Sequence, residues 1–450
     1  MPTNGVSARD RFPCKSAPSA EGRRGYSSDV ATAAKSVTET CREAKGAAHL
    51  LARATREAKD ACLGDLADRI EASVGALLEA NRADVDAGRD QGLSEALLDR
   101  LTLTEARVAE MAKGVREIAD LDDPVGEVVE GWTLENGLEV AKKRVPIGVV
   151  AVVYEARPNV TIDAAALCLK SGNAAVLRGS SSAESSNAFL AGLIADALRA
   201  AELPSASVSV ISGGGHEQLE ELATQEGLVD LIIPRGGEGL KNALKAVAKV
   251  PVMYAAAGNC HVYVHADADL EMADKVAYNA KVQRPGVCNA AETLLVHRQV
   301  AEDLLPTLLA KLSEAGVELV GDEATLAAAG SVAVGPASDE DWDTEYHGLK
   351  MAVGVVDSVE DAIDHINRHG TGHSDAIVTR SQEVGEEFTD GVDSAAVYVN
   401  ASTRFTDGYE FGMGAEIGNS TQKLHARGPI GLRELTTTKY VVHGSGQIRE

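Results

Sequence analysis

The spacing of apolar and polar residues changes along the chain. Residues 31–120 are rich in Ala and Leu, with charged residues at helical spacing, which predicts several helices that end before Pro124. Residues 127–145 instead alternate between apolar and polar side chains, with Asn136 and Gly137 between the two halves. Because Asn-Gly tolerates the positive φ angles of a type I′ turn, this segment is predicted to be a β-hairpin.

Short and nearly continuous apolar runs follow Pro146, with helical stretches between them. Strands that are buried on both faces of a parallel sheet have this pattern. The first set of runs lies at 147–155, 174–178, 208–212 and 228–234. A second set lies at 261–264, 292–297, 350–356, 375–379 and 395–400. The predicted fold class is therefore α/β, with two doubly wound α/β domains and a cleft between them as the default active site. A last β-like run, at 434–443, has no helix after it and could pair with the early hairpin as a separate arm.

The length and the charge of the chain narrow the choice of partners. A chain of 450 residues suits two α/β domains. The net charge of −25 argues against nucleic acid as a partner, and it leaves open whether the surface is adapted to high salt. No apolar run is long enough to span a bilayer and no secretory signal is visible, which predicts a cytoplasmic protein. Residues 1–30 have no periodicity and are predicted to be a disordered tail.

The cysteines point to a reducing compartment and to one candidate nucleophile. The six cysteines are scattered and form no C-x-x-C, which predicts free thiols. Cys288 lies in a turn after Pro285 and Gly286, beside the cationic Arg284. A nearby cation and a helix end lower the pKa of a thiol and favour the nucleophilic thiolate. The alternative interpretation is that Cys288 is a small buried hydrophobic side chain.

Polar residues at the ends of the predicted strands are candidates for oxyanion and phosphate binding. Asn159 lies just past the first strand, where its amide could donate to a developing oxyanion. Arg178 ends the next strand, and a cation followed by several hydroxyls makes a seat for a phosphate. A surface arginine is the alternative. Glycine-rich turns at 212–217 and 234–239 could also approach a phosphate, but neither matches G-x-G-x-x-G, so each could be a plain strand–helix turn.

Three histidines have the spacing of helical metal ligands. His365, His369 and His373 are four residues apart. Gly370 and Gly372 are expected to end that helix, and no suitable carboxylate completes the set. We therefore expect solvated or capping histidines and no metal.

Taken together, four segments resemble the γ-glutamyl phosphate reductase family of the aldehyde dehydrogenase superfamily. They cover most of residues 35–440, and they are VPIGVVAVVYEARPNVTIDAAALCLKSGNAAVLRG, QRPGVCNAAETLLVH, YVNASTRFTDGYEFGMGAEI and STQKLHARGPIGLRELTTTKY. The resemblance implies three parts: a cofactor-binding domain, a catalytic domain and a β-arm for oligomerisation. Their expected bounds are 31–124 with 147–259, 260–433, and 125–146 with 434–450.

The resemblance also implies roles for single residues. Cys288 matches the catalytic thiol, and Asn159 matches the amide that binds the oxyanion. Glu345 resembles the carboxylate that holds the nicotinamide ribose, and Arg178 matches the basic residue under the adenosine ribose. The expected cofactor-binding residues are Arg178, Gly179, Ser180, Ser181, Gly236, Gly237 and Glu345. Arg284 and Arg404 are candidates for substrate binding from their position alone.

The residue at position 181 bears on the choice of cofactor. Relatives that prefer NAD have an acidic residue there, which grips the ribose hydroxyls. Ser181 leaves room for a 2′-phosphate, so the expected cofactor is NADPH/NADP⁺.

The implied reaction is the NADPH-dependent reduction of L-glutamyl 5-phosphate to L-glutamate 5-semialdehyde, the second step of proline biosynthesis from glutamate. A hydrolytic aldehyde dehydrogenase is the first alternative, but Ala255 occupies the place of the glutamate that activates water in such enzymes. A catalytically silent scaffold is the second, and retention of both Cys288 and Asn159 argues against it. The expected partners are a small-molecule substrate, further copies of the chain and, as a candidate, glutamate 5-kinase.

Overall fold

The N-terminal helices begin where the sequence offers a capping side chain. The computed structural model describes residues 35–211, 215–254 and 257–449. Ser36, Thr55, Ser94 and Thr104 each accept a hydrogen bond from a backbone N–H in the first turn of a helix. The last of these helices ends at Asp120, so the predicted helical region and its end are confirmed. The helices are α1 (Val37–Leu51), α2 (Arg56–Ala72), α3 (Val74–Asp90), α4 (Glu95–Leu101) and α5 (Glu105–Asp120).

The first set of apolar runs forms a parallel sheet of four strands, in the order β5-β4-β3-β6. Its strands are β3 (Val149–Tyr154), β4 (Ala174–Arg178), β5 (Val208–Ile211) and β6 (Leu231–Arg235). The helical segments that connect or follow them are α6 (Pro158–Lys170), η1 (Ser181–Ala183), α7 (Glu184–Ala200), η2 (Ser205–Ser207), α8 (His216–Ala223) and α9 (Glu238–Val247).

Both faces of this sheet are covered by helices, as the apolar runs predict. Val150 and Val152 of β3 belong to the core shared with α2, α5, α6 and α7. Val149, Ala151 and Val153 face the opposite way, into the core shared with α1, α8 and α9. Every residue of β3 is buried, which is why the run shows no alternation.

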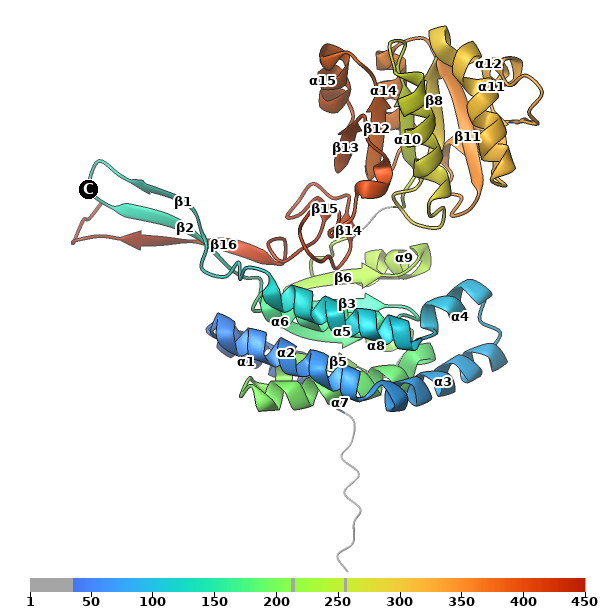
Figure 1. Ribbon diagram of the computed structural model, residues 1–450. Helices are drawn as coiled ribbons and strands as arrows, with labels where there is room; N and C mark the ends of the chain where they lie inside the picture. Colours follow the sequence, from blue (N-terminus) through green and yellow to red (C-terminus); the bar gives the residue numbers. More distant parts are fainter. Residues whose placement is uncertain (1–34, 212–214, 255–256, 450) are drawn as a thin grey trace, which may run out of the picture. The chain divides into compact units, whose positions relative to one another are not determined.

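The second set forms a parallel sheet of seven strands, in the order β10-β9-β11-β8-β7-β12-β13. Its strands are β7 (Cys260–Val264), β8 (Ala291–His297), β9 (Glu318–Gly321), β10 (Gly335–Pro336), β11 (Lys350–Val356), β12 (Ser374–Val378) and β13 (Ala396–Val399). Its helices are α10 (Leu270–Val282), α11 (Arg298–Glu314), α12 (Glu323–Ala328), α13 (Asp339–Asp343), α14 (Val359–His369) and α15 (Gln382–Gly391). Figure 1 shows α10 and α11 along the β8–β11 part of this sheet.

The second sheet differs from the prediction at one edge. The strands β9 and β10 were missed because β9 has only two large apolar residues between an exposed Glu318 and Gly321, and β10 is a Gly-Pro pair. The chain then leaves this sheet earlier than the predicted bound at 433. Apolar residues of the segment 415–432, which includes Ala415 and Ile417, pack into the core of the first sheet. Ser36–Glu450 forms one compact unit, and its division into functional domains stays a prediction.

Three antiparallel strands form the predicted arm, in the order β1-β2-β16 (Figure 1). They are β1 (Val128–Thr133), β2 (Glu139–Pro146) and β16 (Thr436–His443). The pairing of the C-terminal run with the hairpin is confirmed, with Thr436 opposite Pro146 and His443 opposite Glu139. The short remaining elements are η3 (Thr403–Phe405), β14 (Asn419–Ser420) and β15 (Gly428–Pro429).

The turn of the hairpin is not of the predicted type. Gly137 has a φ of +85°, but Asn136 does not have a positive φ, and a type I′ turn needs both. The N–H of Gly137 donates to the carbonyl of Leu134, and the N–H of Leu134 donates to Leu138. The connection is therefore a loop of three residues that ends in a left-handed glycine, so the Asn-Gly signal located the turn without fixing its length.

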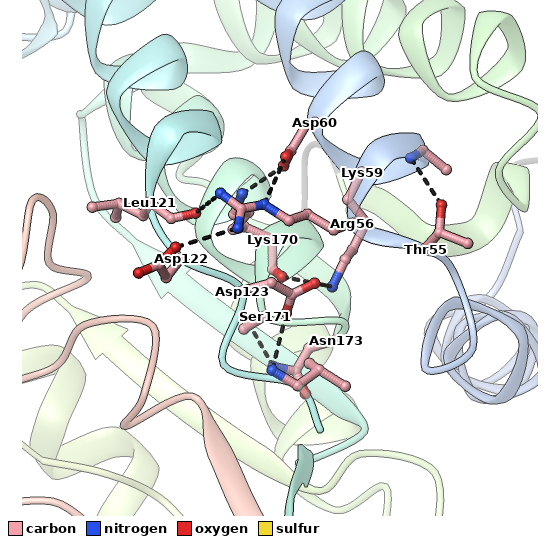
Figure 2. Close-up of polar contacts among 12 residues, drawn as sticks. Thr55, Arg56, Lys59, Asp60, Leu121, Asp122, Asp123, Lys170, Ser171 and Asn173 are labelled. Atoms are coloured by element: carbon pink, nitrogen blue, oxygen red, sulfur yellow. Dashed lines mark hydrogen bonds and ion pairs between the residues drawn. The ribbon is translucent and has the colours of Figure 1, made fainter. Parts of the chain in front are cut away.

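A buried polar network lies where the arm begins, and Figure 2 shows its contacts. Lys59, which is 1% exposed, pairs with Asp123 at 2.5 Å and donates to the carbonyl of Lys170 at 3.0 Å. Lys170, which is fully buried, pairs with Asp60 at 2.5 Å. Asn173 donates to the carbonyl of Leu435, just before β16. We call Lys59, Asp60, Asp123, Lys170 and Asn173 the arm-root network.

The sequence also predicts that no segment is long and apolar enough to span a bilayer. Among the described helices, none is both long enough and apolar enough to cross a membrane. The predicted tail at 1–30, Cys14 and Ala255 lie outside the described residues.

Candidate active site

Cys288 lies in the loop between α10 and β8, where its backbone touches the chain before β7. The Cys260 thiol donates to the carbonyl of Cys288 at 3.1 Å. A Cβ at Gly258 would collide with the same carbonyl, so only glycine allows this approach. The Cys288 side chain is exposed, whereas the other four described cysteines are buried, and all five are free as predicted.

The residue after Cys288 fixes the loop to a second turn. Asn289 is 5% exposed, and its amide donates to the carbonyl of Thr406 at 3.0 Å. The Thr403 hydroxyl donates to the carbonyl of Asn289 at 2.7 Å. The guanidinium of Arg404 donates to the side-chain oxygen of Asn289 and, at 2.8 Å, to Gln283. Arg404 is thus held in one orientation at the loop that carries Cys288.

A cavity of about 370 Å³ surrounds Cys288 and brings together six of the predicted site residues. They come from both sheets and from the loops between them, and they are Cys288, Glu345, Gly236, Gly237, Arg284 and Arg404. The cavity is not lined by the other five predicted residues, which are Asn159, Arg178, Gly179, Ser180 and Ser181.

The charges around the thiol do not act as the sequence suggested. Enclosure by the protein raises the pKa of Cys288, and Glu345 and Glu416 raise it further. The main cation that opposes them is Arg235, the last residue of β6, and Arg404 also interacts with the thiol, whereas the predicted Arg284 is not among the main contributors. The net pKa of Cys288 lies above its ordinary value, so in this state the loop does not favour the thiolate.

Glu345 faces the cavity with one oxygen paired and one unpaired. Its Oε2 accepts from His347 at 3.0 Å, and its side chain is 9% exposed. Its Oε1 is buried and has no partner among the described residues. Burial is the largest single effect and raises the pKa of Glu345, but the hydrogen bond and charge of His347, together with smaller contributions, lower it overall. That same hydrogen bond raises the pKa of His347, which has a left-handed φ of +54°.

The glycines after β6 place an anion site beside this cavity. Gly237 caps α9, and its N–H donates to the carboxylate of Glu155 at 3.1 Å. A Cβ at Gly236 would lie 2.7 Å from that carboxylate. A carboxylate therefore already occupies the N-terminus of α9, where backbone N–H groups attract anions.

The other predicted cofactor residues lie at the carboxyl end of β4. Arg178 donates to the carbonyl of Gly215 at 2.9 Å. Gly179 packs on Asn187 too closely for any side chain. Ser180 accepts from the N–H of Ala156 at 3.0 Å, and Ser181 is exposed. Because β3, β4 and β6 are parallel neighbours, this group and Gly237 lie at the same edge of the sheet, where dinucleotides bind in such folds.

Asn159 lies in the first turn of α6 with its side chain exposed. Its amide donates to the carboxylate of Asp163, one turn along the helix, at 3.1 Å. The amide is thus already bonded within its own helix in this state, and its predicted role as oxyanion donor stays a prediction.

Comparisons with known proteins agree with one another. A sequence model of the aldehyde dehydrogenase family matches residues 19–349. The γ-glutamyl phosphate reductase of Syntrophomonas wolfei is 52% identical over 411 residues, which is 91% of this chain and 98% of the relative. That of Thermobifida fusca is also 52% identical, over 92% of this chain and 99% of the relative. The crystal structure of the γ-glutamyl phosphate reductase of Thermotoga maritima superposes with a TM-score of 0.90 at 45% identity, covering 92% of this chain and all of that one.

The chain is a member of the γ-glutamyl phosphate reductases, within the aldehyde dehydrogenase family. The resemblance inferred from the four segments is confirmed, and so is the aldehyde dehydrogenase fold. More distant structures share the fold alone, among them an acetylating aldehyde dehydrogenase of Geobacillus thermoglucosidasius at 19% identity with a TM-score of 0.65. The family uses NAD or NADP.

This reductase has site residues that the sequence reasoning missed. Arg235, Asp407, Glu416 and Asn419 all line the cavity. Arg235 carried a usable signal, because it is a cation at the end of a buried strand. The other three lie in a glycine-rich segment without strands or helices of useful length, and a Cβ at Gly418 would lie only 2.9 Å from the Arg235 guanidinium. That contact joins distant parts of the chain, so no local pattern could reveal it.

Of the three spaced histidines, which were predicted to be solvated or capping, His373 is buried and His365 and His369 are partly exposed. His373 is 1% exposed, and His365 packs edge-on against Trp342 and His261. His369 ends α14 and pairs with Asp343 at 2.8 Å. Burial lowers the pKa of His365 to about 3 and that of His373 to about 4. Among the residues that the structure describes, no cluster could hold a metal ion.

Proposed function

We propose that the enzyme reduces L-glutamyl 5-phosphate to L-glutamate 5-semialdehyde with NADPH, releasing phosphate through a thioester on Cys288. This is the second step of proline biosynthesis from glutamate. The observation that carries the proposal is the cavity itself, where an exposed thiol lies among cationic side chains and beside a buried carboxylate with a free oxygen. The names of the 52% identical relatives support the reaction.

The protein's own part in the chemistry starts at Cys288. Its thiolate attacks the γ-carbonyl carbon, and the carbon–sulfur bond forms. The bond to the phosphate oxygen then breaks, and phosphate leaves with the electron pair, which gives the thioester. Arg235 favours the thiolate against Glu345 and Glu416. Arg284 and Arg404 are the candidate seats for the phosphate and the α-carboxylate, and Asn289 already orients Arg404.

The oxyanion of this step needs donors, and we propose the backbone N–H of Cys288 and the amide of Asn159. Asn159 would have to exchange its bond to Asp163 for one to the substrate. Asn159→Ala should then lower kcat by about 10²–10³ with little change in KM. A variant with normal kcat would remove Asn159 from the oxyanion site and leave its bond to Asp163 as its role.

The residues present fit NADPH at three points. The free, buried Oε1 of Glu345 can accept from a ribose hydroxyl. The N-terminus of α9 at Gly237 already binds a carboxylate and can bind a pyrophosphate. Arg178 with Ser181 can take a 2′-phosphate. When bound, NADPH supplies the hydride that brings the acyl carbon to the aldehyde level. Cys288 is then released as the thiolate.

We also propose that copies of the enzyme assemble through the arm. Its apolar side chains are exposed in the single chain, with Trp132 at 42%, Tyr440 at 62% and Val442 at 52%. Exposed apolar side chains gathered on one small sheet favour burial against a partner. Glutamate 5-kinase stays a candidate partner, because the acyl phosphate that it would pass on is labile.

The deciding experiment is the reverse reaction. The enzyme should reduce NADP⁺ with glutamate semialdehyde only when inorganic phosphate is present, because phosphate must accept the acyl group from Cys288. A hydrolytic aldehyde dehydrogenase would release the free acid and would need no phosphate. Reduction of NADP⁺ at the same rate without phosphate would therefore refute the proposed reaction.

A further inference from the structure

Two carboxylates line the cavity on the side of a glycine turn. Asp407 and Glu416 belong to one segment, and the N–H of Gly408 donates to Glu416 Oε2 at 3.0 Å. The N–H of Tyr409 donates to Asp407 at 2.9 Å. A Cβ at Gly408 would lie 2.8 Å from the Cβ of Glu416, so the turn that carries Asp407 packs directly on Glu416. Backbone contacts thus hold two like charges close together at the wall of the cavity.

A third acceptor in the same cavity has no partner. Asn419 is 5% exposed and lines the cavity, and its side-chain oxygen has no donor among the described residues. Buried polar atoms rarely lack a hydrogen-bond partner, because an unmade hydrogen bond costs free energy of folding. A missing donor is therefore expected to come from a ligand. The carboxylates of Asp407 and Glu416 and the side-chain oxygen of Asn419 are all acceptors, so that donor should be a cation with several N–H groups.

Nearby protein cations do not neutralise this group fully, although Arg404 interacts with Asp407. Arg235 lies against Gly418 and interacts with Glu416. Burial and the nearby Asp407 nevertheless raise the pKa of Glu416 to about 7. Elsewhere the cavity is lined by guanidinium groups, including Arg284 and Arg404. The cavity thus has an anionic part and a cationic part, and a molecule with both kinds of charge would fit it.

We propose that Asp407, Glu416 and the side-chain oxygen of Asn419 bind the α-ammonium group of the substrate and make the enzyme selective for an α-amino acid derivative. This inference rests on the proposed function, because L-glutamyl 5-phosphate carries one ammonium beside its phosphate and carboxylate. Ammonium donates three hydrogen bonds and accepts none, which matches three acceptors. Glu416 could instead accept the proton of the Cys288 thiol, but a base of that kind gives no reason for the unpaired oxygen of Asn419.

The test compares two aldehydes in the reverse reaction with NADP⁺ and phosphate. One is glutamate semialdehyde, counted as open-chain aldehyde because it closes to a cyclic imine in solution. The other is 5-oxopentanoate, which has the same chain without the amino group. Wild-type enzyme should prefer the amino compound in kcat/KM by at least about 10²-fold, because a site built for a donor rejects an analogue that lacks it.

The variants Glu416→Gln and Asp407→Asn should each reduce this preference by about tenfold or more, mainly through a higher KM for the amino compound. Removing the charge of Glu416 also changes the surroundings of the Cys288 thiol, so the quantity compared is the ratio of kcat/KM between the two aldehydes, in which an effect on the thiol cancels. Both amide side chains keep an oxygen for the N–H of Gly408 or Tyr409, so the turn is preserved. Glu410→Gln is the matched control, because Glu410 is exposed and does not line the cavity. If either variant fails to fold, Asn419→Ala supplies the same comparison.

The possible outcomes separate the two proposals. Wild-type enzyme that is inactive with both aldehydes overturns the proposed function and the ammonium site with it. An active wild type whose variants keep the full preference overturns the ammonium site alone. An equal loss of kcat with both aldehydes in Glu416→Gln also overturns it, and would make Glu416 a base.

Discussion

Two buried polar regions of this molecule differ in whether their atoms have partners. In the arm-root network no buried side-chain nitrogen or oxygen lacks a hydrogen bond among the described residues, although Lys59 and Lys170 are almost fully enclosed (Figure 2). In the cavity around Cys288, Glu345 and Asn419 each keep a buried oxygen that accepts no hydrogen bond from residues 35–211, 215–254 or 257–449. Leaving such an atom unpaired costs about 1–3 kcal/mol. The first region is built to hold elements together, and the second to receive groups from a ligand.

The comparison predicts that changes in the cavity affect activity without lowering stability. Cys288→Ser should lower kcat by more than about 10³-fold, because an alcohol gives far less nucleophilic anion at neutral pH than a thiol. NADPH binding, measured by fluorescence titration, and the unfolding midpoint should stay unchanged. The control is Cys62→Ala, since Cys62 is buried in α2 outside the cavity. Substantial turnover by the serine variant would remove Cys288 from the mechanism.

The arm-root network should respond in the opposite way. Lys59→Met leaves the enclosed carboxylate of Asp123 without its cation, and should lower the free energy of unfolding by about 3–5 kcal/mol. The kcat of the folded enzyme should not change. Adding Asp123→Asn should recover much of the loss, because replacing both partners of a buried pair is often nearly neutral.

Urea denaturation measures these stability effects. The matched control is Lys113→Met, whose lysine pairs with Glu117 at the surface and is 75% exposed, and a change within about 0.5 kcal/mol is expected. A loss in Lys59→Met no larger than in the control would mean that the network adds nothing to stability.

Features that are set by residues close together in the chain could be predicted from the sequence. The strand at 149–154 was found because a strand covered on both faces must be apolar throughout. Cys288 was predicted as the nucleophile because it lies in a Pro-Gly turn beside a cation and because the family resemblance matches it to the catalytic thiol, and the structure places it exposed at the cavity. The predicted helix-to-arm boundary held for a similar local reason, since Pro124 ends the helical pattern.

The remaining features depend on contacts between segments that are far apart in the chain. Arg235 acts on Cys288 although 53 positions separate their numbers, because both reach one cavity. The arm-root network joins Asp123 to Lys59 and Leu435 to Asn173. Pairings of this kind follow from packing, and neither periodicity nor a local motif records them. A family resemblance supplies residue roles, but it did not point to Asp407, Glu416 or Asn419.

Glu416 allows the free-energy cost of an empty ligand site to be measured. Burial raises its pKa to about 7 in the folded protein, against about 4.3 for an unfolded chain. A raised acid pKa means that the folded state holds the proton more tightly, so this contribution to stability is present below about pH 4 and is lost as the pH rises to about 7. Glu416→Gln should therefore be about 1–3 kcal/mol more stable than wild type at pH 8 and equal to it near pH 4. Urea unfolding at the two pH values, with exposed Glu410→Gln as control, measures it. Equal stability of Glu416→Gln and wild type at both pH values would contradict the raised pKa of Glu416.

Variants of Arg178 test whether the adenosine end of the cofactor binds at the carboxyl end of β4. Arg178 donates to the carbonyl of Gly215, as the arm-root residues donate to carbonyls, yet it ends β4 shortly before the exposed Ser181, and residues 179–182 include no acidic residue. If it binds a 2′-phosphate, Arg178→Ala should weaken NADPH about 10–100-fold and NADH much less, because a guanidinium bonds a phosphate through two N–H groups. Ser181→Glu should shift preference toward NADH, since a carboxylate accepts from the free 2′-hydroxyl and repels the phosphate. The two changes together should be non-additive if both act on one phosphate. The measurement is kcat/KM with both cofactors for wild type, the two single variants and the double variant. An equal loss of both cofactors in Arg178→Ala would make its bond to Gly215 structural, and the phosphate seat would then lie in the glycine turns at 212–217 or 234–239.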